Sequence, residues 1–337
     1  MFDIVTFGSA TQDIYLKSQK FLPVLNKEFT TGKGICLPFG SKIEMEDIFF
    51  TSGGGGTNTA ATFANQGFKV AYCGMVGDDN FGKLVIEDLK RYGINTSLMK
   101  KTKEMSTNIA VLLMQPGSDR TILVYRGASD LLKKKDIPWD KIKKTKWMYL
   151  APFAGQLTDL TLELVEFAQK NKIKVALNPG YNQLTLAEPT LQKILKGIDV
   201  LILNREEASL LTQIPYQKEE EIFKKIDQLT PGIAIMTKGA EGATVSDGKD
   251  LYYAKSLGMK MIDGTGAGDA FGSGFVSGLI KKNDVAHAIQ LAMANSSFAI
   301  TKLGAKEGIL TKNQAWPKIK VFKENCSAND LCRTKRT

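Results

Sequence analysis

The chain alternates short apolar runs with longer segments in which apolar residues recur every three or four positions. The short runs predict buried strands at Ile4–Phe7, Val70–Cys73, Trp147–Leu150, Lys174–Leu177, Val200–Leu203 and Ile233–Met236. The longer segments predict helices at Thr57–Gln66, Gly82–Tyr92, Thr158–Asn171, Glu206–Leu211, Lys218–Leu229 and Ala267–Lys281. This alternation predicts an α/β fold with a mostly parallel central sheet between helices. Ligands in such sheets bind beyond the carboxyl ends of the strands.

Two stretches, residues 14–51 and 107–127, depart from this alternation. They contain extended runs such as Ile109–Met114 and Thr121–Tyr125 on either side of the turn Pro116–Asp119. Such runs are typical of hairpin strands. We therefore expect β-hairpins added to the main α/β body.

Composition indicates one large domain of ordinary character. The 337 residues are 43% hydrophobic and 24% charged. No apolar run reaches the roughly 18 to 20 residues of a membrane helix, and the first residues lack a basic signal segment, so we expect a cytoplasmic protein. The scattered cysteines, without a C-x-x-C pair, favour free thiols over a disulfide framework. They are Cys36, Cys73, Cys326 and Cys332.

Charge and histidine content exclude several classes of function. With His287 as its single histidine, the chain cannot form a two-histidine metal site. The net charge of +10 is spread along the chain, and no aromatic RNA-binding motif interleaves the basic runs. We therefore expect neither a nucleic-acid nor a membrane partner, and an attraction for small anionic substrates.

The segment Met261–Phe275 carries the clearest chemistry. Asp263 and Asp269 flank a turn of small residues that leads directly into a predicted helix. Small residues allow backbone N–H groups to approach an anion, and the helix dipole stabilises a phosphate there. A carboxylate beside that anion is repelled by it, so Asp269 suits the removal of a proton from an attacking hydroxyl. The segment predicts phosphoryl transfer to an alcohol. The alternative is a glycine-rich helix entry with a capping aspartate.

This segment resembles the C-terminal motif D-T-x-G-A-G-D-x-F of the PfkB/ribokinase family of carbohydrate kinases, with Gly264 in place of the usual threonine. The resemblance runs from about residue 2 to residue 312. It implies a ribokinase-like three-layer α/β/α sandwich, a kinase domain at 1–312, and a small β-sheet lid formed by segments 14–51 and 107–127. Residues 313–337 form an extension, whose basic tail we expect to be frayed.

The resemblance also implies catalytic and substrate-binding roles. Asp269 becomes the general base, and the N–H groups of Gly266, Ala267 and Gly268 stabilise the transferring phosphoryl group of ATP. On the acceptor side, four residues contact the substrate or flex as the lid closes. They are Asp13, Gly53, Gly54 and Asn58. A loop aspartate that caps the next element, and a flexible loop without chemistry, are the alternatives for this side.

The nucleotide-side roles are implied in the same way. Asn204 and Glu207 match an N-x-x-E motif that holds hydrated Mg²⁺ through water, with helix capping by Asn204 as the alternative. Asn295 is expected beside the adenine. In several family members a monovalent cation such as K⁺ lies near the positions of Asp263 and Thr265, so K⁺ activation stays open. Thr237, Gly239 and Gly242 match a T-x-G-x-x-G nucleotide loop.

Two other glycine patterns are rejected. Gly77–Lys83 fits the first seven positions of a P-loop, but Leu84 stands where Ser or Thr must hold Mg²⁺. The glycines at 264, 266 and 268 lack the dinucleotide spacing, which makes an NAD-dependent enzyme a weak rival.

The sequence leaves the function open among three alternatives. We expect a kinase acting on a primary hydroxyl of a small sugar or sugar derivative. Ribokinases carry a lysine where this chain has Gly55, so strict ribokinase activity is not expected. A nucleoside kinase of the same family is the alternative, with Phe153 or Tyr125 stacking on a base, and Arg120 is a candidate for an acidic sugar. A non-catalytic nucleotide-binding protein is a remote third. Exposed lid strands offer edges for a homodimer.

Overall fold

The computed structural model describes residues 1–29, 32–115 and 120–326. Its main sheet has nine strands in the order β17-β16-β15-β14-β13-β12-β11-β1-β6. The six strands from β14 to β6 are parallel, and β15, β16 and β17 extend the sheet antiparallel. Their bounds are β1 Ile4–Phe7, β6 Val70–Cys73, β11 Trp147–Leu150, β12 Lys174–Leu177, β13 Val200–Asn204, β14 Ile233–Thr237, β15 Ala243–Ser246, β16 Asp250–Ala254 and β17 Val321–Asn325.

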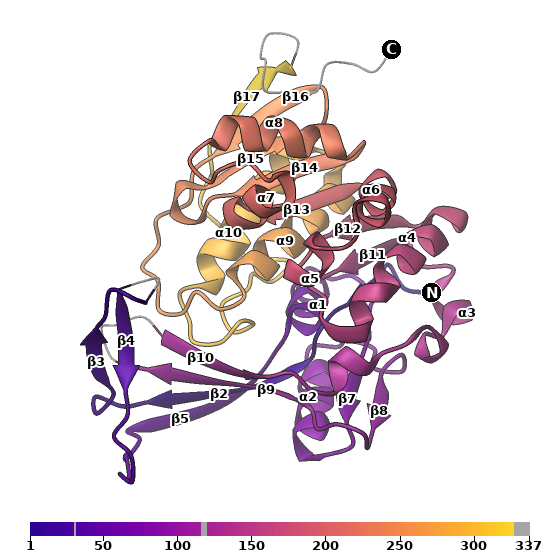
Figure 1. Ribbon diagram of the computed structural model, residues 1–337. Coiled ribbons are helices and arrows are strands. Elements are labelled where there is room, and N and C mark those ends of the chain that lie inside the picture. The colour runs from indigo at the N-terminus through magenta and orange to yellow at the C-terminus, as the bar shows by residue number, and fades with distance from the viewer. Residues whose placement is uncertain (30–31, 116–119, 327–337) are drawn as a thin grey trace.

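Helices cover both faces of this sheet (Figure 1), because successive strand residues point to opposite sides. In β1, Ile4 belongs to one hydrophobic core, together with residues of the helices at 55–65, 267–282 and 285–299, whereas Val5 and Phe7 belong to a second core, together with residues of the helices at 160–170, 188–196 and 219–229. Two hydrophobic cores result, and the three-layer sandwich expected from the sequence is confirmed. The helices are α1 Gly55–Asn65, α2 Asn80–Arg91, α3 Trp139–Ile142, α4 Leu160–Lys170, α5 Tyr181–Leu184, α6 Glu188–Lys196, α7 Arg205–Thr212, α8 Glu219–Leu229, α9 Ala267–Lys282 and α10 Val285–Ala299.

The expected lid is a four-stranded mixed sheet that projects from one end of the main body (Figure 1). Its order is β10-β9-β2-β5, with β2 and β9 parallel and the outer pairs antiparallel. The expected turn Pro116–Asp119 lies outside the described residues. The lid strands are β2 Thr11–Lys17, β5 Asp47–Gly53, β9 Asn108–Met114 and β10 Arg120–Tyr125, and the smaller pairs are β3 Leu22–Leu25 with β4 Lys33–Cys36 and β7 Met75–Gly77 with β8 Lys100–Thr102.

The C-terminal extension differs from the frayed tail expected from its basic composition. Residues Val321–Asn325 form β17, which pairs antiparallel with β16 at the edge of the main sheet. Lys323 makes an ion pair of 2.8 Å with Asp250 across that pair of strands. The expectation of free thiols holds for Cys36 and Cys73 but is wrong for Cys326, which is disulfide-bonded. Within the described residues, no helix has the length and apolar character needed to cross a membrane.

Candidate active site

The glycine-rich turn before α9 leaves backbone N–H groups open toward a cavity. Gly266 caps the helix in the left-handed region at φ 75°, and a Cβ there would lie 2.6 Å from the Cβ of Ala305, so this position requires glycine. Among the described residues, the N–H groups of Gly266 and Gly268 donate to no protein acceptor, whereas that of Ala267 donates to the Gly264 carbonyl at 3.3 Å. A Cβ at Gly268 would meet nothing within 4 Å. The turn therefore has room and donors for an anion.

Asp263 fixes the turn by accepting hydrogen bonds from three elements. Its Oδ1 accepts from the N–H of Thr265 at 2.9 Å and from the Thr265 hydroxyl at 2.7 Å. Its Oδ2 accepts from the lid residue Tyr15 at 2.9 Å and from the N–H of Gly304 at 3.0 Å. Burial alone would raise the pKa of Asp263, but these hydrogen bonds outweigh it and lower the pKa. Asp263 is thus an ionised anchor with its oxygens already engaged, and the K⁺ site stays a prediction.

Asp269 lies in the first turn of α9 and is oriented by Asn58 of α1. The amide nitrogen of Asn58 donates to Asp269 Oδ2 at 2.8 Å, and no described residue donates to Oδ1. Burial raises the pKa of Asp269, while the Asn58 hydrogen bond and the charge of Lys306 lower it. One carboxylate oxygen is therefore held and the other is available. This is the arrangement that a general base requires.

Asp13, in lid strand β2, is packed directly over Gly53 of β5. A Cβ at Gly53 would lie 2.1 Å from Asp13 Oδ2, so a side chain there would displace the carboxylate. Gly54 has φ 93°, and a Cβ there would lie 2.5 Å from the Ser9 carbonyl oxygen. Burial raises the pKa of Asp13 to about 7, with Lys306 opposing the shift. No described residue donates a hydrogen bond to the Asp13 side chain, which leaves both oxygens for a ligand.

A cavity of about 400 Å³ lies beyond the carboxyl end of β14, between the anion turn and α10. The predicted residues Thr237, Gly239 and Gly242 all line it, together with Ala267 and Gly268. Gly242 is required there, because it has φ 102° and a Cβ would lie 1.9 Å from the Ala254 carbonyl oxygen. The apolar part of the wall is formed by Met259, Met261, Phe271, Met293 and Ile300. The cavity thus joins a polar, glycine-rich end to an apolar end.

Asn295 does not line this cavity, so its expected place beside the adenine is wrong. Its side chain is fully buried, with 0% of the residue exposed. The amide nitrogen donates to the carbonyl of Ala270 at 2.8 Å and to Thr62 Oγ1 at 3.2 Å, and the oxygen accepts from the N–H of Leu310 at 2.7 Å. Asn295 joins α10 to α9 and α1, and its neighbours Ser296 and Ser297 face the cavity instead.

Asn204 and Glu207 form a reciprocal cap at the start of α7. Asn204 Oδ1 accepts from the N–H of Glu207 at 2.8 Å, and Glu207 Oε2 accepts from the N–H of Asn204 at 2.9 Å. The capping alternative is confirmed. Burial raises the pKa of Glu207 to about 7, the Asn204 N–H opposes the shift, and the charge of Asp269 adds to it. The water-mediated Mg²⁺ site stays a prediction. Among the described residues, no cluster of three or more His, Cys, Asp or Glu side chains could hold a metal ion directly.

Sequence reasoning missed two residues of this site. Tyr15 links the lid to Asp263, and Lys306 places a buried ammonium group within electrostatic reach of Asp13 and Asp269. Lys306 directly follows Gly304 and Ala305 in the turn after α10. A single lysine after a turn carries no signal that it is buried.

Comparisons with known proteins show the family and the fold of the chain. A family model described as pfkB family carbohydrate kinase matches residues 1–312. Ribokinase of Lactococcus lactis is 29% identical over 291 residues, which are 85% of this chain and 91% of that protein. The structure of Arabidopsis thaliana ribokinase complexed with ribose and ATP is similar with a TM-score of 0.75 at 20% identity, covering 92% of this chain and 96% of that one. A nucleoside kinase of Methanocaldococcus jannaschii is similar with a TM-score of 0.72, also at 20% identity, covering 92% and 96% of the two chains.

Proposed function

Because the chain belongs to the pfkB family of carbohydrate kinases, we propose that it transfers the γ-phosphoryl group of ATP to a primary hydroxyl of a small sugar or sugar derivative. Family membership establishes a phosphotransferase of the sugar and nucleoside kinase group. The observation that carries the finer proposal is the Asp269 carboxylate, held at Oδ2 by Asn58 at 2.8 Å beside open N–H groups of the anion turn.

In this proposal the acceptor lies between Asp13 and Asp269. Two neighbouring hydroxyls donate to the oxygens of Asp13, which have no other partner among the described residues. The absence of a side chain at Gly53 and Gly54 leaves space for the ring. The buried Oδ1 of Asn58, which lacks a hydrogen-bond partner in the described protein, accepts from a further hydroxyl.

Transfer then follows the in-line course that phosphoryl chemistry requires. Asp269 Oδ1 accepts the proton of the attacking hydroxyl, while the N–H groups of Gly266 and Gly268 stabilise the charge on the transferring group. The Ala267 N–H contributes once its weak bond to Gly264 opens. The adenine occupies the apolar end of the cavity near Met293 and Phe271.

Mg²⁺ fits the donor types at the start of α7. Glu207 Oε1 and the exposed Asn204 side chain offer carboxylate and amide oxygens, which suit Mg²⁺ through bridging water. When bound, the ion would neutralise part of the triphosphate charge. Burial raises the pKa of Glu207 to about 7, and a cation bound nearby would lower that pKa and favour the ionised carboxylate.

The experiment that tests this function measures ADP release from Mg-ATP across free sugars, sugar acids, sugar phosphates and nucleosides. We expect one class to be phosphorylated, and Asp269→Asn to lower turnover by about 10² or more with near-normal ATP binding. Asp284→Asn is the matched control, since Asp284 caps α10 by accepting from the N–H of His287 at 2.7 Å. If Asp269 served only as a helix cap, both variants would show equally small losses of turnover.

The outcomes of this panel separate the alternatives. Phosphorylation of nucleosides alone would favour the nucleoside kinase over the sugar kinase. In that case Phe153 could not stack on the base, because it is 3% exposed within the core. ATP binding without any acceptor-dependent turnover would favour the non-catalytic alternative. Unchanged turnover in Asp269→Asn would remove the assignment of the base.

A further inference from the structure

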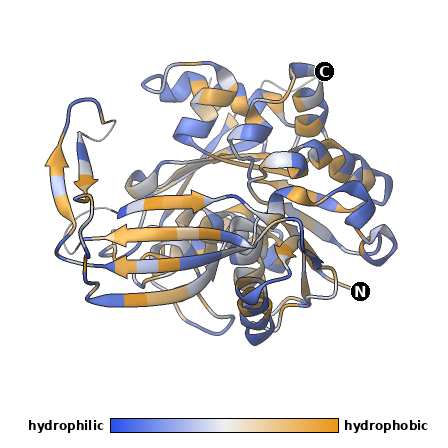
Figure 2. Ribbon diagram, turned by 60° about the horizontal axis from the view of Figure 1, so that its bottom comes forward, coloured by the Kyte–Doolittle hydropathy of each residue, from blue (hydrophilic) through white to orange (hydrophobic). Residues whose placement is uncertain are grey.

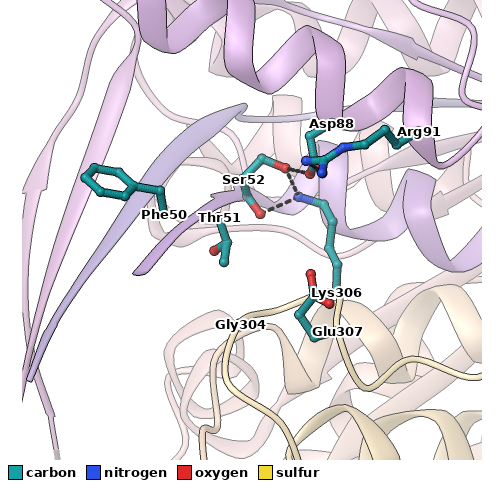
Figure 3. A pocket seen from close by; sticks show the side chains of 8 residues that line it. All are labelled: Phe50, Thr51, Ser52, Asp88, Arg91, Gly304, Lys306 and Glu307. Carbon is teal, nitrogen blue, oxygen red and sulfur yellow. Dashed lines mark hydrogen bonds and ion pairs between the residues drawn. The ribbon is translucent and has the colours of Figure 1, made fainter. Parts of the chain in front are cut away.

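Lys306 is a buried lysine that reaches from the C-terminal part of the chain into the acceptor side of the site. The residue is 4% exposed and lies in the turn that follows α10. Its Nζ donates to the carbonyl oxygen of Ser52 at 2.5 Å and to Ser52 Oγ at 2.7 Å (Figure 3). Ser52 immediately precedes Gly53 and Gly54. The ammonium group therefore holds the end of strand β5 from which the acceptor-site glycines follow.

On its other side, the same turn contacts Asp263 and Gly266 of the glycine-rich turn before α9. The N–H of Gly304 donates to Asp263 Oδ2 at 3.0 Å. Ala305 packs so closely on Gly266 that a Cβ at Gly266 would lie 2.6 Å from it. Three consecutive residues, 304 to 306, thus contact both the glycine-rich turn before α9 and the end of strand β5.

The ammonium group is also one end of a charged chain that extends to α2. Ser52 Oγ donates to Asp88 Oδ2, and Asp88 Oδ1 pairs with Arg91 at 2.6 Å. Burial lowers the pKa of Lys306 to about 8, against the opposing charges of nearby carboxylates. The charged groups around it are Asp88 and Arg91 of α2, Asp13 of β2, Asp269 of α9 and Glu307 of its own turn.

We propose that Lys306 is a positioning residue of the acceptor site, whose protonated side chain ties the Ser52–Gly54 hinge to the turn carrying the anion loop. Without that tie, Gly53 would lose its fixed place beneath Asp13. The role in acceptor binding rests on the proposed kinase function, but the tie itself does not. A neutral amine keeps two N–H donors and loses the charge that strengthens both bonds, so the hinge should loosen above neutral pH.

The cavity beside Lys306 makes the proposal testable by chemical rescue. A space of about 140 Å³ adjoins the side chain (Figure 3). Truncation of Lys306 to alanine would extend that space toward Ser52, so a small alkylammonium ion can enter and restore the missing donor. Its walls are formed by Phe50, Thr51, Ser52, Asp88, Arg91, Gly304, Lys306 and Glu307.

The first test does not depend on activity. Hydrogen–deuterium exchange of residues 50–58 is compared at pH 7 between the natural chain, Lys306→Met and Lys281→Met. Lys281 is the matched control, because its Nζ donates to Gln66 Oε1 at 2.6 Å away from the hinge. We expect exchange about tenfold faster in Lys306→Met and unchanged in Lys281→Met.

A second arm uses the natural chain, so it stands even if Lys306→Met does not fold. After correction for intrinsic exchange rates, protection of residues 50–58 should fall between pH 7 and pH 9, while that of α9 stays constant. Equal protection of the hinge at both pH values, or in Lys306→Met and the natural chain, would overturn the proposal.

The kinetic test separates positioning from general loss of structure. In Lys306→Ala we expect the KM for the acceptor to rise about tenfold, with the KM for ATP within about twofold, and propylammonium to reverse the effect saturably. Parallel losses for both substrates without rescue would contradict the proposal. If the natural chain phosphorylates no acceptor, the proposed function fails. The exchange measurements then still show whether Lys306 holds residues 52–54 in place.

Discussion

At the scale of single residues, the Asp13 carboxylate is held in an environment that disfavours its charge. It is 4% exposed, and burial raises its pKa to about 7. A folded-state pKa above the unfolded value means that the folded chain binds more protons between about pH 4 and pH 7. The stability that Asp13 contributes is therefore present below pH 4 and is lost as the pH rises through 7. The fold gives up stability to keep two acceptor oxygens free.

Asp13→Asn should consequently separate stability from function. At pH 8 we expect the free energy of unfolding to rise by about 2 to 4 kcal/mol, with little change at pH 4, because the ionised carboxylate is no longer buried. Acceptor kcat/KM should fall at least tenfold. Denaturant unfolding at both pH values and steady-state kinetics measure the two effects. In the natural chain, acceptor kcat/KM should rise with pH up to about 7.

Asp79→Asn is the control, because it should change the free energy of unfolding in the opposite direction. Asp79 accepts from the N–H groups of Gly82 and Thr107, both at 2.7 Å, and these bonds outweigh burial and lower its pKa. Its stabilisation is present above the unfolded pKa and is lost as the pH falls. The asparagine variant should lose stability at pH 8, by about 1 kcal/mol or less once solvent screening of this part-exposed group is allowed for, because an amide nitrogen cannot accept the N–H of Thr107. A stability gain in both variants would contradict the electrostatic argument for Asp13.

Residues within one local motif could be placed from the sequence, whereas those with distant partners could not. Asp269 and the glycines before α9 lie where their spacing predicts, because the turn and helix are built from neighbouring residues. Asn295 was misplaced because its partner Thr62 lies 233 positions earlier in the sequence. Lys306 was missed for the same reason, since its partner Ser52 lies 254 positions earlier.

At the scale of elements, all six strands predicted from apolar runs are confirmed as the parallel part of the sheet. Two of the antiparallel strands, β15 and β17, were missed because they lack such runs, whereas β16 contains the run Leu251–Ala254 and was overlooked. β15 is buried along its whole length but alternates Thr and Ser with Ala and Val, and β17 is a largely exposed edge strand. The helices α3, α5 and α6 were missed as well. The lid strands were expected as hairpins, but their order in the sheet depends on β2 pairing with both β5 and β9.

The junction of β5 with α1 yields a prediction about an element boundary. Gly53→Ala should raise the acceptor KM at least tenfold, because the new methyl group would lie 2.1 Å from Asp13 Oδ2 and must push the carboxylate aside. Gly197→Ala is the control, since its methyl group would lie 2.4 Å from Val165 Cγ1 in the core. Kinetics and thermal unfolding should show lost binding in the first variant and mainly lost stability in the second. The reverse pattern would remove Gly53 from the acceptor site.

At the scale of the whole molecule, the lid strands are rich in hydrophobic residues (Figure 2), and many of the exposed large hydrophobic side chains belong to them. Along β10, Leu123 is 53% and Val124 61% exposed, although they point to opposite faces, and Phe50 of β5 is 55% exposed. Apolar patches of this kind mark association sites. We propose that a second copy of this chain covers the lid, as the sequence analysis left open.

Leu123→Asp should therefore shift the chain from dimer toward monomer. Tyr181→Asp is the control, because Tyr181 is 68% exposed on α5, outside the lid. Light scattering after size-exclusion chromatography, over a range of concentrations, measures the mass of each variant. A natural chain that is monomeric throughout, or equal loss of dimer in both variants, would contradict the proposed interface.

The late position of β17 in the chain has a consequence for synthesis. Every residue of the proposed active site precedes position 307, whereas the strand that pairs with the outer side of β16 comes from 321–325. A nascent chain can thus form the glycine-rich turn before α9 while the backbone of β16 still lacks its outer partner. During that interval the open edge can pair with a neighbouring chain. Pairing with β17 removes this exposure of β16.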